Sequence, residues 1–296
     1  MHDRDRLHRF VFEHYPIRGH LVHLDAAWRA LIEHRDYPPA IRDILGEAVA
    51  ASLLLAATIK FEGVLSLQLQ GAGPVHLLLV QCTSGHGVRG LARHRGQDDG
   101  NFGELLGAGN LTVTLETDDG AQRYQGIVPI SGDRLADSLQ LYFENSEQLP
   151  TRLWLHADGT GAAGMLLQRL PSDGAAPDTA AAVDDAWRRV QLIADTLTPE
   201  ELRTLADADI LHRLFNEDDL RLFEASPVFF RCRCSRERVG GMLQGLGEAE
   251  TRAVLAERGE VEVRCDFCNR AYVFDAVDVA QLFNSGVPSG GGSSVH

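Results

Sequence analysis

Residues 39–70, PAIRDILGEAVAASLLLAATIKFEGVLSLQLQ, place a very apolar segment next to an alternating one. In 39–59 apolar residues recur at helical spacing, and in the second half of this segment they lie on almost every side of the helix. This pattern predicts a buried helix with proline in its first turn. In 64–70 apolar and polar residues alternate, which predicts a strand with one buried face. The longest nearly apolar run, 48–59, is shorter than the roughly 20 residues of a membrane span.

Further alternating segments predict more strands in the first half of the chain. The turn sequences Gly71-Ala-Gly-Pro74 and Asp118-Asp-Gly120 join neighbouring segments, and the second is typical of a hairpin, so the strands should pair antiparallel. A second helix is expected after Asp133 as N-cap, with Leu135 on its inner face. The expected fold class is α+β, with an antiparallel-sheet domain and helices over 1–176. The further strand segments are 111–116, 124–128 and 152–156.

The composition changes at 171–182 to Pro, Gly, Ala, Ser and Asp, which predicts a linker and a domain boundary. The expected helical linker, 177–226, is acidic: from Asp178 to Glu224 there are twelve acidic and five basic residues. Apolar residues at helical spacing and the capping box Thr198-Pro-Glu-Glu201 predict short amphipathic helices. Such short helices are marginal alone, so they should dock on another part of the protein. A plain helical subdomain is the alternative.

Four of the five cysteines form two close pairs in the C-terminal part, 227–285. Four thiolates in two pairs match the tetrahedral coordination of zinc. The second pair lies between strand-like segments at 260–264 and 271–274, as expected for a turn that holds a metal. A unit this small has a marginal core, so loss of zinc should unfold it. The tail, 286–296, is expected to be disordered. The expected ligands are Cys232, Cys234, Cys265 and Cys268.

Two features favour a redox role for these cysteines. Only one residue separates Cys232 from Cys234, and a disulfide across so small a ring would be strained and reversible. Six arginines flank the two pairs and should favour the thiolates that oxidants attack. The alternatives are an inert zinc ribbon, a zinc-ribbon nucleic-acid protein, and a thiol-disulfide oxidoreductase that uses Cys265 and Cys268. A βαβ setting is typical of that oxidoreductase motif and is absent around this pair.

Charge and missing motifs exclude other classes of protein. The formal net charge of −14 and the pI near 5.3 are unfavourable for a nucleic-acid partner. The sequence has neither a G-x-S-x-G elbow nor a P-loop, so we expect no enzyme activity. The first residues lack the apolar segment of a secretory signal, so the expected compartment is the cytoplasm.

Three weaker signals are assigned structural roles. The motif Gly85-His-Gly-Val-Arg-Gly90 fits G-x-G-x-x-G, but the segment after it is too short for a phosphate-binding helix, so we predict a hairpin loop. Cys82 ends an apolar run and is predicted to be a buried, inert thiol. The N-terminal histidines lack metal-binding spacing and are predicted to be exposed or hydrogen-bonded. They are His8, His14, His20, His23 and His34.

With the cysteines placed, the chain resembles the 33 kDa heat shock protein family of bacteria, the redox-regulated, zinc-binding holdase chaperones. The resemblance extends over about 7–283 and consists of segments that follow one another in the family's order. These segments are FEHYPIRG (12–19), KFEG (60–63), QLQGAGP (68–74), RYQG (123–126), EQLPTRL (147–153), GMLLQ (164–168), CRCSRER (232–238) and CDFC (265–268).

The resemblance implies a substrate-binding domain at 1–176, a metastable linker at 177–226 and a zinc redox-switch domain at 227–285. It implies that the reduced form with one Zn²⁺ is inactive. Peroxide with partial unfolding, or hypochlorite, would form a disulfide within each close pair and release zinc. It also implies that unfolding client proteins are held without ATP, that the oxidised form dimerises, and that no nucleic acid or membrane takes part. The implied disulfides are Cys232–Cys234 and Cys265–Cys268.

These expectations combine into one mechanistic hypothesis. Loss of zinc unfolds the small domain, the acidic linker loses its docking partner there, and apolar linker residues become available to clients. The negative charge would keep client complexes in solution. Gly240 and Gly241 should weaken the helix after Ser235 by about 1 kcal/mol each relative to Ala. The candidate client-binding residues are Trp187, Val190, Ile193, Leu202 and Leu205.

Overall fold

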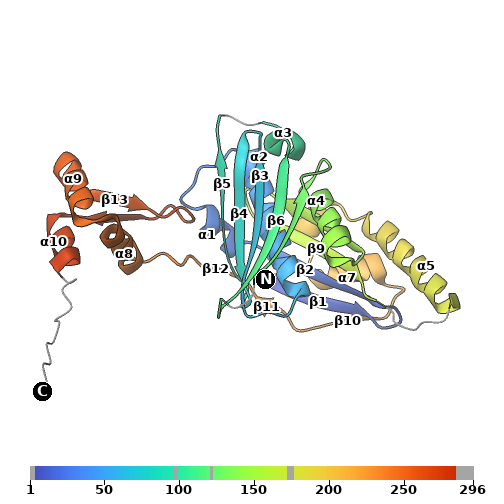
Figure 1. Cartoon of the computed structure of the whole chain (residues 1–296). Helices are drawn as coiled ribbons and strands as arrows, with labels where there is room; N and C mark the ends of the chain where they lie inside the picture. Colours follow the sequence, from blue (N-terminus) through green and yellow to red (C-terminus); the bar gives the residue numbers. More distant parts are fainter. Residues whose placement is uncertain (1–3, 97–98, 121–122, 172–176, 285–296) are drawn as a thin grey trace, which may run out of the picture. The chain divides into compact units, whose positions relative to one another are not determined.

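The computed structural model describes residues 4–96, 99–120, 123–171 and 177–284 (Figure 1). It divides the chain into two compact units, Met1–Arg231 and Cys232–His296. The tail predicted at 286–296 lies outside the described residues.

The first unit contains two six-stranded sheets within its described residues. Sheet A has the order β10-β1-β2-β9-β8, with β11 also paired to β1, and all of its pairs are antiparallel. Its strands are β1 (Arg6–Phe12), β2 (Ile17–Leu24), β8 (Thr151–Ala157), β9 (Ala162–Arg169), β10 (Leu220–Leu222) and β11 (Ser226–Pro227).

Sheet B has the order β12-β5-β4-β3-β6-β7. Its pairs are antiparallel except for β12, which runs parallel to β5. The strands predicted from alternation and the α+β fold class are confirmed. The strands of sheet B are β3 (Gly63–Gly71), β4 (Val75–Thr83), β5 (Gly87–His94), β6 (Gly109–Thr117), β7 (Arg123–Pro129) and β12 (Phe229–Phe230).

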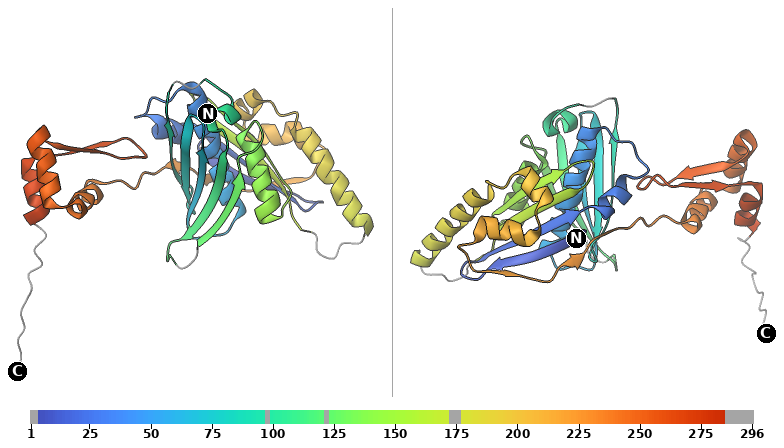
Figure 2. Two further views of the ribbon diagram at one scale, coloured as in Figure 1. Left: turned by 45° about the horizontal axis from the view of Figure 1, so that its top comes forward. Right: turned by 180° about the vertical axis from the view of Figure 1, so that it is seen from behind.

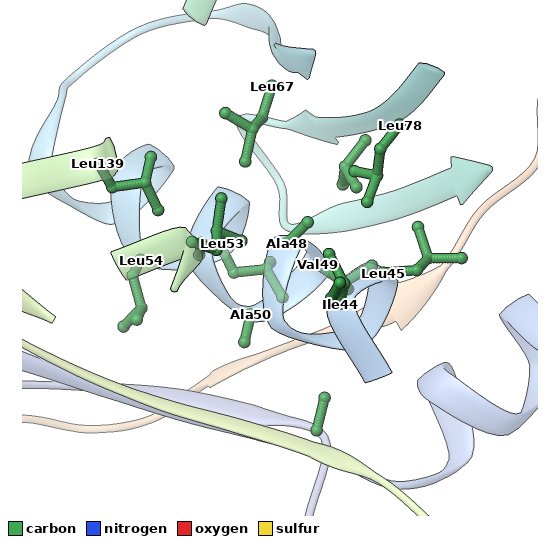
Figure 3. Packing of buried hydrophobic residues seen from close by; sticks show 14 of the residues in the cluster. Ile44, Leu45, Ala48, Val49, Ala50, Leu53, Leu54, Leu67, Leu78 and Leu139 are labelled. Carbon is green, nitrogen blue, oxygen red and sulfur yellow. The ribbon is translucent and has the colours of Figure 1, made fainter. Parts of the chain in front are cut away.

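Helix α2 (Pro39–Thr58) packs against strands of both sheets, which is why its sequence is apolar on nearly every side. Figure 3 shows Leu45 and Leu53 of α2 close to Leu67 of β3 and Leu78 of β4. The predicted helix is therefore confirmed. The core of the first unit forms around it.

Helix α4 (Leu135–Tyr142) begins one residue later than predicted. Its N-cap is Arg134 rather than Asp133. The carboxylate of Asp137, three residues after the N-cap, accepts hydrogen bonds from the backbone N–H groups of Asp133 and Arg134. Leu135 is buried, as expected. The other helices of the first unit are α1 (Ala26–Ile32), α3 (Phe102–Leu106), the π-helical turn η1 (Phe143–Glu147), α5 (Pro177–Ala194), α6 (Pro199–Thr204) and α7 (Asp207–Phe215).

The acidic segment belongs to the first unit in this structure. Helices α5 to α7 pack their apolar faces on sheet A (Figure 2), with α6 against β8 and β9. The strands β10 and β11 that follow pair with β1. The structure thus shows no break between compact units at 176, because the amphipathic helices need an apolar surface to cover. The three-part division of the chain stays a prediction about its behaviour.

The second unit is a small hairpin with three helices over its described residues. Strands β13 and β14 pair antiparallel, in the two segments predicted from sequence. Its core consists of six buried apolar residues, which is few for an independent unit. They are Val239, Leu243, Val261, Tyr272, Phe274 and Val279. The elements are α8 (Arg236–Leu246), α9 (Glu248–Arg258), β13 (Val261–Arg264), β14 (Ala271–Phe274) and α10 (Ala276–Asn284).

Candidate metal centre

The four cysteines of the second unit lie on two short segments. Cys232 and Cys234 directly precede α8, whose N-cap Ser235 accepts a hydrogen bond from the N–H of Arg238. Cys265 and Cys268 lie in the turn between β13 and β14. That turn is closed by the N–H of Cys265, which donates to the carbonyl oxygen of Arg270 at 3.0 Å. The helix cap and the hairpin therefore fix the two pairs.

The four Sγ atoms all lie within 4.8 Å of one another. Two separations across the pairs are 3.4 Å, between Cys234 and Cys268, and 3.6 Å, between Cys232 and Cys265. Four sulfurs at about 2.3 Å from one tetrahedral ion lie about 3.8 Å apart. The sulfur set therefore fits a four-coordinate metal ion, and within the described residues it is the only such group of metal-ligating side chains.

Hydrogen bonds make the four thiols unequal. Burial alone would raise the pKa of Cys234, but hydrogen bonds from Tyr272 and the neighbouring cysteines outweigh it and lower the pKa to about 7. Burial raises the pKa of Cys268 to about 12.

Two of the six flanking arginines form ion pairs with acidic side chains. Arg236 pairs with Asp278 at 2.6 Å, and Arg264 pairs with Glu262 at 2.5 Å. Arg270 acts electrostatically with both Cys268 and Cys234. The expectation that the surrounding arginines as a group favour the thiolates is thus met by Arg270 and not by those two ion-paired residues.

The model of a family described as Hsp33 protein matches residues 5–275. This chain belongs to the Hsp33 family. The resemblance inferred from the sequence segments is therefore confirmed.

Curated relatives of this Hsp33 chain match along its whole length. The 33 kDa chaperonin of Methylobacillus flagellatus is 48% identical over 294 residues, 99% of each chain. The 33 kDa chaperonin of Nitrosococcus oceani is 49% identical over 289 residues, 97% of each chain. Family membership and these names support a chaperone role.

A solved structure shares the fold of this Hsp33 chain. The crystal structure of the 33 kDa chaperonin from Thermotoga maritima matches with a TM-score of 0.79 and 20% identity, and covers 95% of this chain and 99% of that one. At this identity the likeness shows the fold alone. Among the residues described here, none of the helices has the length and apolar character to span a membrane.

The five candidate client-binding residues of the Hsp33 linker are covered by sheet A. Val190 is fully buried, Trp187 is 8% exposed, and both belong to one buried apolar cluster with Phe10 and Phe12 of β1. The hypothesis placed the docking surface of the linker on the cysteine unit, and this part is wrong, because sheet A supplies the matching apolar face. The remaining candidates, Ile193, Leu202 and Leu205, lie in the same cluster.

The discounted signals have the structural roles predicted for them. Gly85 lies in the turn between β4 and β5, and no helix follows the motif. Cys82 is fully buried, and burial raises its pKa to about 12, so its thiol is inert. His8 and His23 both contact Asp207, whereas His20 is 1% exposed and burial lowers its pKa to about 3.

Sequence reasoning missed two polar contacts of this Hsp33 chain. Tyr272 donates a hydrogen bond to Cys234 at 3.2 Å, and alternation in 271–274 could have placed its side chain on the buried face. Asp207 is separated from His8 by 199 positions in the chain. No pattern within a single element signals such a long-range contact.

Proposed function

We propose that this Hsp33 chain is a redox-regulated holdase that binds unfolding proteins without ATP and prevents their aggregation under oxidative or heat stress. The observation that carries the proposal is the four-sulfur cluster in a unit with a very small core. In the reduced chain the four thiolates hold one Zn²⁺, and the chaperone is inactive. The bound zinc supplies a cross-link between the segment before α8 and the β13–β14 turn. The chain acts in the cytoplasm, with no catalytic turnover.

Oxidation replaces the metal ligands by covalent bonds. The Cys232 and Cys234 thiolates together give up two electrons as their S–S bond forms. One hydrogen peroxide accepts those electrons, its O–O bond breaks, and with two protons it becomes two waters. A second peroxide oxidises Cys265 and Cys268 in the same way. A disulfide sulfur is no longer a thiolate ligand, so the oxidised cysteines would no longer hold a metal ion.

Unfolding of the second unit follows from its small core. Six buried apolar residues give marginal stability, so the unit depends on metal binding. The segment that joins it to the linker helices is held by strands of only two or three residues, β10, β11 and β12. Loss of structure after Cys232 therefore propagates to α5–α7, which leave sheet A.

Release of the linker would expose two matching apolar faces to unfolding clients. One face carries the client-binding candidates of α5 and α6, and the other is the side of sheet A that contains Phe10, Ile17 and Leu21. The net charge of −14 then keeps the complex from associating further. The oxidised form acts as a homodimer, without a nucleic-acid or membrane partner.

A peroxide titration at heat-shock temperature tests this function. Zinc release and suppression of client aggregation, measured by light scattering, should rise together with disulfide formation. Cys82→Ala is the matched control, because it removes the one buried thiol outside the cluster and should leave the titration unchanged. Equal suppression by the reduced, zinc-bound chain would show that the switch does not exist. Peptide mapping of the oxidised chain would show whether the disulfides join the close pairs or the cross-pairs Cys232–Cys265 and Cys234–Cys268.

A further inference from the structure

Asp207, the first residue of α7, lies where the linker helices meet β1 and β2. Its carboxylate is 2.5 Å from Nδ1 of His8 on β1 and 2.6 Å from Nδ1 of His23 on β2. The side chains of Asp207 and His23 are 10% and 4% exposed. One carboxylate of the linker is thus held by two histidines from neighbouring strands of sheet A.

The second ring nitrogen of His23 also contacts the linker. Nε2 is 2.6 Å from the carbonyl oxygen of Leu202 in α6. A carbonyl oxygen can only accept a hydrogen bond, so Nε2–H of His23 donates to Leu202, while Nδ1 faces the carboxylate of Asp207. His23 therefore joins α6 and α7 to sheet A through nearly buried polar contacts.

The surrounding charges reinforce this contact. Arg4 donates to the carbonyl oxygens of Arg203 at 2.7 Å and Thr204 at 3.0 Å, at the end of α6. Arg203 in turn forms an ion pair with Asp25 at 3.0 Å. Burial alone would raise the pKa of Asp207, but the hydrogen bonds from His23 and His8 outweigh it and hold that pKa well below its usual range. The carboxylate is therefore ionised throughout the neutral range.

We propose that His8, His23 and Asp207 form a polar latch that holds α6 and α7 on sheet A and acts separately from the cysteine centre. A nearly buried charge that loses its partner is strongly destabilising, so the latch determines how easily these helices leave the sheet. Its link to client binding rests on the proposed function, in which linker release exposes the apolar faces. The latch then gives the linker a second control point that needs no change at the thiols.

The test compares two Asp→Asn variants of α7 in the reduced, zinc-loaded full chain. Asp207→Asn keeps the side-chain shape and removes the charge, and Asp209→Asn makes the same change at an exposed position of the same helix. We expect amide hydrogen exchange in 199–215 to become at least about tenfold faster in D207N and to match wild type in D209N. Equal exchange in the two variants would overturn the latch. His8→Asn, at the more exposed histidine, should give a smaller increase and serves as the test if D207N does not fold.

Suppression of client aggregation by reduced D207N separates the latch from the proposed function. Faster amide exchange together with suppression of client aggregation, at unchanged zinc content, supports both the latch and the proposed function. Faster exchange without suppression supports the latch and counts against the linker and sheet A faces as the client-binding surface.

Discussion

The hydroxyl of Tyr272 donates a hydrogen bond to Sγ of Cys234 at a distance of 3.2 Å. Tyr272 is only 9% exposed and belongs to the core of the second unit, so packing fixes the position of this donor. Partners that hydrogen-bond metal ligands typically change metal affinity by about 10–100-fold. Tyr272→Phe should therefore weaken zinc binding by roughly tenfold while the fold of the unit is kept.

Competition with a chromophoric chelator measures this change in the reduced chain. Tyr15→Phe is the control, because Tyr15 belongs to the first unit and packs against its apolar cluster. Equal zinc affinity of Y272F and wild type would show that the hydroxyl does not support the metal centre.

Removal of zinc from the reduced chain should unfold the second unit and leave the first one folded. The second unit has six buried apolar residues among its described residues, whereas the first has a large core around α2. Hydrogen exchange after chelation should show lost protection in α8 and β13–β14 and unchanged protection in α2. A metal-free, reduced chain that keeps full protection at β13–β14 would contradict both this prediction and the proposed switch.

The sequence predicted the structure best where the pattern that indicates a feature lies within one short segment of the chain. The run 39–59 showed its helix because nearly every face is buried, and the two close pairs of cysteines indicated the four-sulfur cluster. The surface on which the linker docks could not be predicted, because periodicity shows that Trp187 lies on an apolar face but does not show what covers that face. Strands of two or three residues, such as β12, are too short to show alternation.

Glu47 on α2 should make the first unit less stable as the pH rises. Burial, reinforced by Asp43 and opposed by Arg134, raises the pKa of Glu47 to about 8. The unfolded chain loses this proton near pH 4.3, so between that pH and about 8 the folded state binds more protons than the unfolded state. Stability contributed by the neutral carboxyl is therefore present at low pH and is lost as the pH rises through this window.

Glu47→Gln should remove this pH dependence. We expect a variant that matches wild type near pH 4.5 and becomes more stable than wild type as the pH rises, by about 4–5 kcal/mol at pH 8. Thermal unfolding of the first unit across this pH range measures the difference, with Glu33→Gln at an exposed position as control. Parallel pH profiles for E47Q and wild type would show that Glu47 is ionised in the folded protein.

Gly240 and Gly241 are neighbours in α8 but differ in the space around them. A Cβ at Gly241 would meet nothing within 4 Å, whereas a Cβ at Gly240 would lie 2.8 Å from Cδ2 of Leu282 in α10. Gly241→Ala should therefore stabilise the second unit by about 1 kcal/mol, since Ala is the better helix former. In Gly240→Ala the contact with Leu282 offsets that gain. Because unfolding of this unit follows zinc loss in the proposed switch, G241A should need more peroxide for activation than G240A. Denaturant unfolding of the zinc-bound second unit measures the two stabilities, and an equal gain in both variants would show that Leu282 moves aside without cost.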